Sequence, residues 1–274
     1  MDKDILTRIT RASVLEENAQ IHDRLSRTHE RLASHVAKPN CRAFYHQLIT
    51  EILERFHIHP QRVLELGCGT ASYADLFAGS YTGVDVSKGM IDVARQRVPR
   101  GEFHVCSAEE FLAQGQGFDL IFSSSFVHHV HDVDDLFMGI SGSLCPGGAY
   151  VAIHEPLRKS FDVDKRALSE IVDEAVGILC GWYSAPMPFA RRVHKAVTVA
   201  LSHLHIGRAG DEDKIDLVDF QLNGDFSPSS LHHAAVKSGL RGYSLIYSFL
   251  RYGWIRKVCG GSRNYFAFVA VRER

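Results

Sequence analysis

The sequence predicts an α/β fold in which a mainly parallel sheet is covered by helices on both faces. A short apolar run at Arg62–Leu66 leads directly into a glycine turn, Gly67-Cys68-Gly69. From there, apolar runs alternate with amphipathic stretches as far as about residue 153. Strands that are separated by helical segments have crossover connections, so they lie parallel in a sheet with both faces covered.

The alternating region predicts five strands, and the C-terminal part predicts two more. The five are Arg62–Leu66, Tyr81–Val86, Glu102–Cys106, Phe118–Ser123 and Ala149–Ile153. Helices are expected at Met90–Val98, Asp132–Leu144 and Ser229–Ser238. The β-rich runs YSLIYSF and NYFAFVAV, which a turn separates, are expected to pair antiparallel at one sheet edge.

Helical patterns precede this region and interrupt it. Apolar residues at helical intervals in residues 1–38 predict one or two amphipathic helices that end near Pro39, and a further helix is expected at Arg42–Phe56. We therefore expect a helical cap over residues 1–60 and a single domain over 61–274. A helical insertion is expected at about 157–222. Its aromatic segment around Trp182 is interpreted either as a lid over a substrate pocket or as packing, including an oligomer interface.

Composition excludes several functional classes. The 274 residues carry 31 basic and 32 acidic side chains, so no field of one sign favours nucleic acid or an anionic membrane as a partner. No apolar run is long enough to span a bilayer, and the N-terminus lacks a signal-peptide pattern. The six cysteines are scattered without a C-x-x-C pair, which is typical of reduced thiols. A cytoplasmic location is the expectation.

The glycine turn VLELGCGT and the later GVDVSKGM indicate a nucleoside site. Glycines at the end of the first strand let a ligand approach the backbone, and open α/β sheets bind ligands at that edge. Asp85 ends the second strand, where a carboxylate can accept both hydroxyls of a ribose. NAD is disfavoured because Ser72 stands at the third glycine position of G-x-G-x-x-G.

Five blocks in order, VLELGCGT, GVDVSKGM, CSAEEF, FDLIFSSSFVHHV and LCPGG, resemble the class I S-adenosylmethionine-dependent methyltransferases, in particular their small-molecule branch. The resemblance covers about residues 62–153. The later FSPSSLHHAAVKSGL and the two strands after it look like the last helix and the hairpin edge of that family. The implied fold is a Rossmann-like, mainly parallel seven-stranded sheet with an antiparallel C-terminal strand.

The resemblance also implies S-adenosylmethionine as the cofactor and assigns its ligands. The methionine end would lie along the first loop, at Glu65, Gly67, Cys68 and Gly69. The nucleoside would contact residues after the second and third strands: Asp85 on the ribose, and Val86, Met90, Ser107 and Ala108 around the adenine. Ser123 and Ser124 would lie near the methionine and the transferred methyl.

Three residues are candidates for catalysis. His128 and His129 follow the fourth strand, at the edge where the methyl should lie, and histidine is a well-matched general base near neutral pH. Neighbouring side chains diverge in an extended loop, so we expect only one of them, with His128 preferred, to face the pocket. Glu155 could orient a substrate hydroxyl or amine. For all three, bracing the loop is the alternative.

No metal site is expected, because the chain has Ser123 and Ser124 where magnesium-dependent relatives place carboxylates, and its histidine pairs lack ligand spacing. The expected function is metal-independent methyl transfer to oxygen, nitrogen or carbon of a small molecule. The aromatic segment around Trp182 favours an acceptor that is partly aromatic or apolar. A S-adenosylmethionine-binding protein with a scaffold role or other chemistry is the first alternative. An NAD-dependent oxidoreductase is the second. The oligomeric state is left open.

Overall fold

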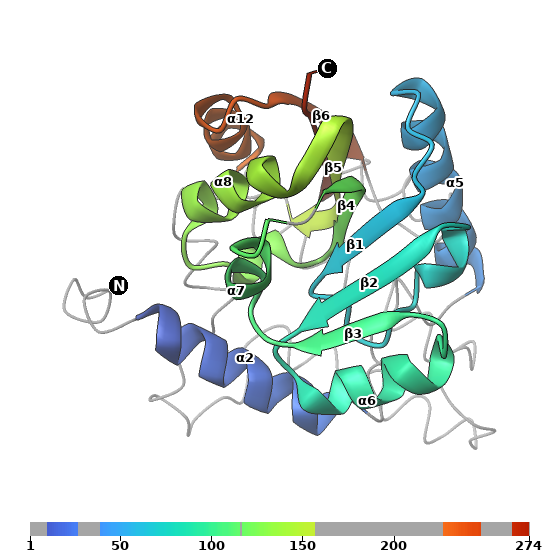
Figure 1. Ribbon diagram of the computed structural model, residues 1–274, viewed down its shortest axis with the longest axis vertical. Coiled ribbons are helices and arrows are strands. Elements are labelled where there is room, and N and C mark those ends of the chain that lie inside the picture. Colours follow the sequence, from blue (N-terminus) through green and yellow to red (C-terminus); the bar gives the residue numbers. More distant parts are fainter. Residues whose placement is uncertain (1–9, 27–38, 116, 157–226, 248–264, 274) are drawn as a thin grey trace, which may run out of the picture. The chain divides into compact units, whose positions relative to one another are not determined.

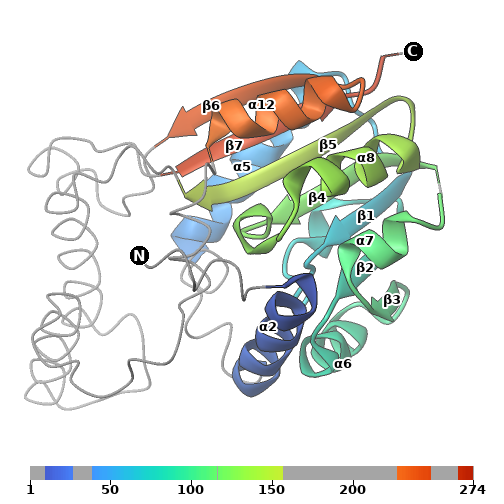
Figure 2. The same ribbon diagram turned by 90° about the vertical axis from the view of Figure 1, so that its left-hand side faces the viewer.

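The computed structural model describes residues 10–26, 39–115, 117–156, 227–247 and 265–273 (Figures 1 and 2). The chain divides into two compact units. The first comprises Met1–Pro156, Leu217–Leu245 and Phe266–Arg274, and the second comprises Leu157–Asp216 and Ile246–Tyr265. The second unit lies almost wholly outside the described residues, as does the insertion predicted at 157–222. The fold and the site below belong to the first unit.

One sheet runs through the described residues, and its strand order is β3-β2-β1-β4-β5-β7-β6. The strands are β1 (Arg62–Leu66), β2 (Ser80–Asp85), β3 (Glu102–Val105), β4 (Phe118–Ser124), β5 (Leu144–Pro156), β6 (Arg241–Tyr247) and β7 (Tyr265–Val271). β1 pairs in parallel with β2 and β4, β2 with β3, and β4 with β5. Arg272, just after β7, exchanges backbone hydrogen bonds with Gly147 and Gly148 near the start of β5, so β7 runs antiparallel to β5.

Six α-helices accompany the described part of the sheet (Figure 1). They are α2 (Arg11–Leu25), α5 (Pro39–Arg55), α6 (Lys88–Arg97), α7 (Ala108–Leu112), α8 (Val133–Ser143) and α12 (Pro228–Lys237). α8 packs between α7 and α12, and α2 packs against α6 (Figure 2). Short 3₁₀ turns, η1 (Ala74–Leu76) and η2 (Val127–His129), follow the loops after β1 and β4.

The central strands form the core because helices cover both of their faces. Leu120, Ile121 and Phe122 of β4 are all fully buried, which is the near-continuous apolar pattern of a strand in a doubly covered sheet. Asp119 fixes the start of the neighbouring strand: its Oδ2 accepts the backbone N–H of Gln61 at 3.0 Å and that of Arg62 at 2.9 Å. Parallel pairing of β1 with β2 and with β4 places the carboxyl ends of these three strands at one edge.

The predicted α/β fold, with seven strands and an antiparallel C-terminal strand, is confirmed. β1 has the predicted bounds, whereas β5 begins at Leu144, before the predicted start at Ala149. α5 begins at Pro39 instead of Arg42, because proline fits the first turn of a helix, whose N–H groups have no intrahelical acceptor. The short helix α7 was not predicted.

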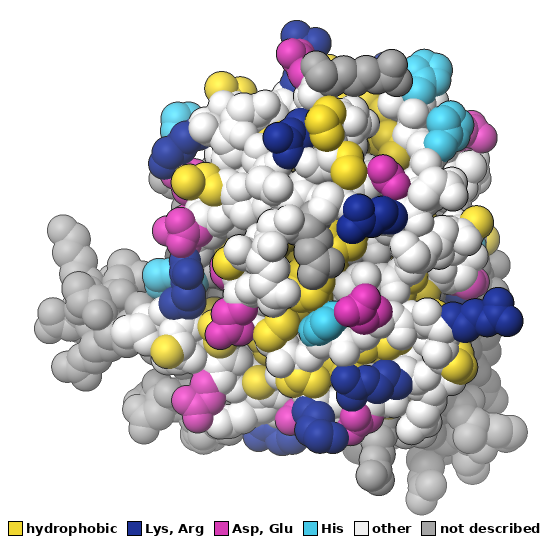
Figure 3. Space-filling view, in the orientation of Figure 1, with side chains coloured by type: hydrophobic (Ala, Val, Ile, Leu, Met, Phe, Trp, Pro, Cys, Tyr) yellow, Lys and Arg dark blue, Asp and Glu magenta, His cyan; other side chains and the backbone are white. Residues whose placement is uncertain are grey.

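Within the described residues, no helix combines the length and the apolar content needed to cross a bilayer. On the face that Figure 3 shows, Lys and Arg side chains are interspersed with Asp and Glu side chains, and no large area carries one sign. That face offers no basic stripe of the kind that tracks a nucleic-acid backbone.

Candidate active site

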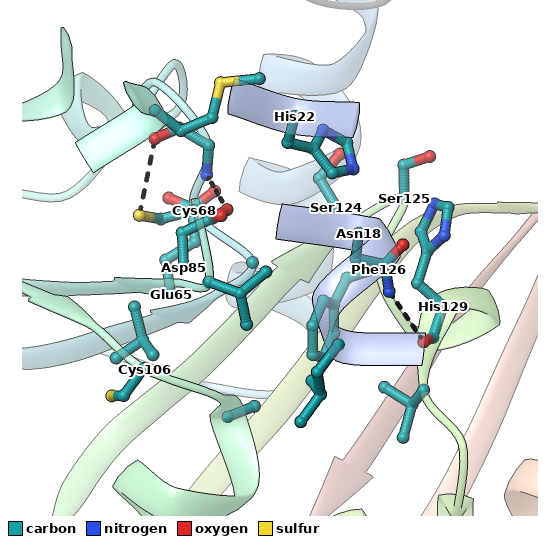
Figure 4. A pocket seen from close by; sticks show the side chains of 18 of the residues that line it. Asn18, His22, Glu65, Cys68, Asp85, Cys106, Ser124, Ser125, Phe126 and His129 are labelled. Carbon is teal, nitrogen blue, oxygen red and sulfur yellow. Dashed lines mark hydrogen bonds between the residues drawn. The ribbon is translucent and has the colours of Figure 1, made fainter. Parts of the chain in front are cut away.

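A cavity lies at the carboxyl ends of β1, β2 and β4, beneath α2 (Figure 4). The sheet order reverses between β1 and β4, and open α/β sheets bind ligands at such a switch point. Five segments contribute to its walls: α2, the loop after β1, the end of β2 with the start of α6, the start of α7, and the loop after β4.

The loop after β1 leaves room at the cavity because two of its residues are glycines. Gly67 and Gly69 have φ of +62° and +51°, a region that glycine enters without steric cost. A Cβ on Gly67 would lie 2.4 Å from Cδ2 of Phe126, whose ring closes over this glycine, whereas a Cβ on Gly69 would meet no atom within 4 Å. Ala71 has φ of +54° without being glycine, which costs on the order of 1 kcal/mol.

Asp85 ties the first two loops together. Its Oδ2 accepts the backbone N–H of Gly69 at 2.9 Å, and its Oδ1 accepts the backbone N–H of Ser87 at 2.8 Å. Burial raises the pKa of this carboxyl, and the two N–H donors work in the opposite direction. Asp85 therefore shapes the glycine loop while it lines the cavity, where a ribose would be within its reach.

Glu155 organises the loop after β4 from beneath. It is fully buried, and its carboxylate accepts the backbone N–H groups of Phe126 at 2.9 Å, Val127 at 3.0 Å and His128 at 3.3 Å. The Nδ1 of His128 lies 2.8 Å from Oε2 of the same carboxylate. These bonds hold a loop in which Ser125 has φ of +55°, a strained value for a non-glycine residue.

His129 takes the place in the cavity that was expected for His128. Its ring lines the cavity, 6.0 Å from the ring of His22 on α2 and at 85° to it (Figure 4). Burial, and then the neighbouring His128 and His22, lower the pKa of His129 well below the ordinary value, so its imidazole is neutral at pH 7. The Oγ of Ser124 and the Nδ1 of His129 are buried and have no hydrogen-bond partner in the described part of the chain.

The cavity unites ten of the fourteen predicted site residues, which are Glu65, Gly67, Cys68, Gly69, Asp85, Val86, Met90, Ala108, Ser124 and His129. The other four lie behind its walls. Ser107 caps α7, accepting the N–H of Glu110 at 3.1 Å, and Ser123 bonds the hydroxyl of Tyr150 at 2.8 Å. His128 and Glu155 pair with each other, so both brace the loop that presents His129.

A helical cap was expected over residues 1–60, but sequence reasoning assigned no residue of α2 to the site. Arg11, Val14, Leu15, Asn18 and His22 line the cavity from this helix. Their spacing of three, four, seven and eleven residues from Arg11 places them on one helical face, which could have been recognised as a face of mixed polarity. Five further residues in or just after the quoted motifs also line the cavity without having been assigned to it: Thr70, Ser72, Tyr73, Cys106 and Phe126.

Residues 64–152, which carry most of this cavity, match the family described as methyltransferase domain. The segment is a class I S-adenosylmethionine-dependent methyltransferase domain. Among curated proteins, the trans-aconitate 2-methyltransferase of Variovorax paradoxus is 32% identical over 100 residues, which are 35% of this chain and 38% of that protein. The ubiquinone biosynthesis O-methyltransferase of Mesorhizobium japonicum is 32% identical over 95 residues, 32% of this chain and 38% of that protein.

These similarities span less than half the length of the curated relatives, so they concern the methyltransferase domain and not whole proteins. Among solved structures, the magnesium protoporphyrin IX methyltransferase of Synechocystis with bound S-adenosylmethionine aligns with a TM-score of 0.51. The alignment covers 93% of this chain and 97% of that one at 11% identity. At that identity it supports the fold of the methyltransferase domain alone.

Glu65 gives the methyltransferase domain a pH-dependent stability. Its carboxyl is buried and hydrogen-bonded by the hydroxyl of Tyr81, and burial raises its pKa to about 8. The folded state therefore holds a proton that the unfolded state releases above its ordinary pKa of 4.5, so stability falls as pH rises from 4.5 to 8. Between pH 6 and 7.5 we expect this group to remove about 2 kcal/mol of the free energy of unfolding.

Urea unfolding of the wild type and of Glu65→Gln at both pH values measures this effect. Glutamine cannot ionise, so the variant should not lose this stability. From pH 6 to pH 7.5, the free energy of unfolding of the wild type should therefore fall by about 2 kcal/mol relative to that of the variant. A difference that stays constant between pH 6 and 7.5 would mean that Glu65 is ionised throughout.

Asp23 fastens α2 over the cavity. Its Oδ1 accepts the hydroxyl of Ser87 at 2.5 Å and the backbone N–H of Gly89 at 2.8 Å, at the start of α6. These bonds lower the pKa of Asp23. We expect Asp23→Ala to speed amide hydrogen exchange along α2 and to weaken S-adenosylhomocysteine binding about five-fold, the worth of one ordinary hydrogen bond. Glu16→Ala, on the exposed side of α2, is the control, and equal exchange in the two variants would contradict the assignment.

Proposed function

We propose that this chain transfers the methyl group of S-adenosylmethionine to a small-molecule acceptor, without a metal ion and with His129 as general base. One observation carries the proposal. A single cavity joins the glycine loop and Asp85, which suit a nucleoside, to Ser124 and His129, whose side chains suit a reacting group. The match of residues 64–152 to the methyltransferase domain supports the choice of cofactor.

The residues fit the cofactor in chemical terms. Asp85 would accept the ribose hydroxyls, with Val86, Met90 and Ala108 against the adenine, while Glu65, Gly67, Cys68 and Gly69 would line the methionine end. When bound, the cofactor supplies a methyl group already activated by the sulfonium. The chain then has to hold an acceptor in line with that methyl and to take up its proton. Orientation of this kind supplies effective molarities of roughly 10⁵ M or more.

Of the two histidines predicted for catalysis, His129 is the one whose ring lines the cavity, whereas His128 is committed to Glu155. Metal-independent transfer stays a prediction; within the described ranges, no three His, Cys, Asp or Glu side chains gather as metal ligands. The roles predicted for Ser107 at the adenine and for Ser123 near the methyl receive no support, because the hydroxyl of each bonds another group behind the cavity wall.

Turnover with a panel of small carboxylic acids, phenols and amines tests the proposal, with S-adenosylhomocysteine as the measured product. We expect one class of acceptor to gain a methyl group, and we expect His129→Ala to slow that reaction while S-adenosylhomocysteine affinity changes little. Tight cofactor binding without turnover on any acceptor would favour the alternative, a cofactor-binding protein without methyl transfer.

Location, assembly and domain organisation belong to the same proposal. The nearly equal numbers of acidic and basic side chains and the scattered cysteines support a cytoplasmic location. The cap at 1–60 is supported in its described part, since α2 covers the cavity. The division at residue 61 and the insertion at 157–222 stay predictions, as does a substrate that is partly aromatic or apolar.

A further inference from the structure

Glu65 is a buried carboxyl group whose hydrogen-bond partner is neutral. Only 2% of its surface is exposed, and its Oε2 accepts the hydroxyl of Tyr81, a second buried side chain. Burial raises the pKa of Tyr81 well above the ordinary value, so that hydroxyl stays protonated. A buried carboxylate needs a positive charge or several donors to stay ionised, and one phenol supplies neither. Glu65 therefore holds a proton in the free protein.

The neighbouring carboxyl, Asp85, is better supplied for ionisation. Its two oxygens accept the backbone N–H groups of Gly69 and Ser87, at 2.9 and 2.8 Å. These donors and the nearby His22 lower its pKa, against the effect of burial. Glu65 lacks such a set of donors and also faces the charge of Asp85, which raises its pKa further. Of the two carboxyl groups at this sheet edge, Glu65 is the one that keeps the proton.

The segments packed against Glu65 bring no positive charge to it in the described part of the chain. Its register partners are Gly83 on β2 and Phe122 on β4, which are uncharged. The thiol of Cys68, in the loop after β1, stays protonated because burial raises its pKa. Among the described residues, the charged side chain that acts on Glu65 is therefore Asp85, which is of the same sign.

The basic side chains of the cavity wall belong to α2 and to the segment after β4: Arg11, His22, His129 and His131. Arg11 is engaged by Asp135 at 2.6 Å, and the ring of His22 lies 6.0 Å from that of His129. Figure 4 shows Glu65 with Asp85 and Cys68, away from His129. Glu109, on α7, adds a further acid to the wall. A cation for Glu65 has to come from a ligand in the cavity, which the side chain of Glu65 lines.

We propose that Glu65 gives up a proton when the cofactor binds, so that the affinity of this domain for S-adenosylhomocysteine rises with pH. The methionine part of the cofactor carries an α-ammonium group, which supplies the missing positive charge. That group need not touch the carboxyl, because an opposite charge within about 4–6 Å already favours the ionised form. This inference rests on the proposed function, whose cofactor it concerns.

The exchange balances in charge. The O–H bond of the carboxyl breaks, the proton passes to solvent, and the ammonium group becomes the counter-ion of the new carboxylate. Burial gives Glu65 a pKa of about 8 in the free protein, and a bound cation lowers it. Binding therefore releases a proton below pH 8, and the affinity should rise about ten-fold from pH 6 to pH 7 and level off above pH 8. The cofactor would thereby offset the stability that the free protein loses as pH rises.

Calorimetric titration with S-adenosylhomocysteine at pH 6, 7 and 8 tests the inference without measuring turnover. This compound lacks the sulfonium, so its ammonium group is the only cation that it brings. At pH 7 the titration is repeated in PIPES and in imidazole, because the dependence of the observed enthalpy on the ionisation enthalpy of the buffer counts the protons released. We expect the wild type to release about one proton and its dissociation constant to fall about ten-fold from pH 6 to pH 7.

Two variants and a second ligand identify the groups involved. Glu65→Gln keeps an acceptor for Tyr81 but cannot ionise, so its affinity should change less than about two-fold from pH 6 to pH 8, without proton release. Glu102→Gln removes a carboxyl whose side chain is 69% exposed and should reproduce the wild type. The nucleoside 5′-methylthioadenosine, which lacks the amino-acid part, should bind the wild type with an affinity that does not depend on pH.

Binding of S-adenosylhomocysteine to the wild type with neither pH dependence nor proton release would overturn the inference. The same proton release in Glu65→Gln would also overturn it and would assign the proton to Asp85 or to a histidine of the cavity. Equal pH dependence for 5′-methylthioadenosine would contradict the role of the ammonium group. Absence of S-adenosylhomocysteine binding at every pH is a separate failure, that of the proposed function.

Discussion

Asp85→Ala is expected to weaken S-adenosylhomocysteine binding by about 100-fold. The variant removes the carboxylate that would accept the ribose hydroxyls and that now holds the backbone N–H groups of Gly69 and Ser87 at 2.9 and 2.8 Å. Hydrogen bonds to a charged group are worth about 1.5–3 kcal/mol each, and about 3 kcal/mol in total corresponds to that loss of affinity. Isothermal titration calorimetry measures it.

Two further variants, Asp85→Asn and Asp92→Ala, distinguish the loss of ribose contacts from other causes of weaker cofactor binding. Asparagine keeps one oxygen acceptor for a loop N–H and should recover part of the affinity. Asp92 carries an exposed ion pair with Lys88 at 2.6 Å, on the same helix, so its loss should leave binding unchanged. If Asp85→Ala binds S-adenosylhomocysteine with an affinity within three-fold of that of the wild type, Asp85 does not contact the cofactor.

Glu155→Gln is expected to lower the free energy of unfolding by about 3–5 kcal/mol, the range found when one partner of a buried charged network is removed. The carboxylate accepts three backbone N–H groups and faces Nδ1 of His128. A glutamine amide replaces one accepting oxygen by a donor, so at least one of these donors would face another donor. Urea unfolding measures the change.

The matched control is Glu102→Gln, because this carboxylate also lies beside a histidine, His104 at 2.9 Å, but is exposed. Its loss should cost less than about 1 kcal/mol. If Glu155→Gln is as stable as Glu102→Gln, the loop after β4 does not depend on Glu155. The carboxylate of Glu155 would then again be a candidate for contact with substrate.

The central strands could be predicted because their apolar runs match their burial. Arg62–Leu66 has the same bounds in sequence and structure, since four consecutive buried residues end at a glycine. β5 was predicted too short because Cys145-Pro146-Gly147-Gly148 has the composition of a turn. In the structure β5 begins before this stretch, because Leu144 already pairs with Phe118, and the stretch then bulges: the next pair is Leu120 with Ala149, and Gly147 has φ of +81°.

Local capping signals explain two further differences. The run Ser107-Ala108-Glu109-Glu110 is a capping box, in which Ser107 and Glu110 satisfy each other's backbone N–H. This signal would have predicted α7 and would have shown that the hydroxyl of Ser107 is already engaged. The resemblance to known methyltransferases instead suggested a contact with adenine.

The division of roles between His128 and His129 could not be predicted. Sequence reasoning expected one of two adjacent side chains to face the cavity, and nothing in the residues themselves decides which. The expected divergence of the two side chains is wrong, because Val127–His129 forms a 3₁₀ turn in which the two rings lie 4.1 Å apart. The deciding interaction is long-range, since Glu155, 27 residues after His128, binds Nδ1 of that ring. The same holds for α2, whose contacts to the start of α6 join residues more than 60 positions apart.

Calorimetric titration of the purified protein with S-adenosylhomocysteine and NADH in parallel tests the central claim most directly. The cavity, with its glycine loop, Asp85 and no third glycine, predicts micromolar binding of S-adenosylhomocysteine and no detectable binding of NADH. Binding of NADH without binding of S-adenosylhomocysteine would contradict the account and would assign the same sheet edge to a nicotinamide enzyme.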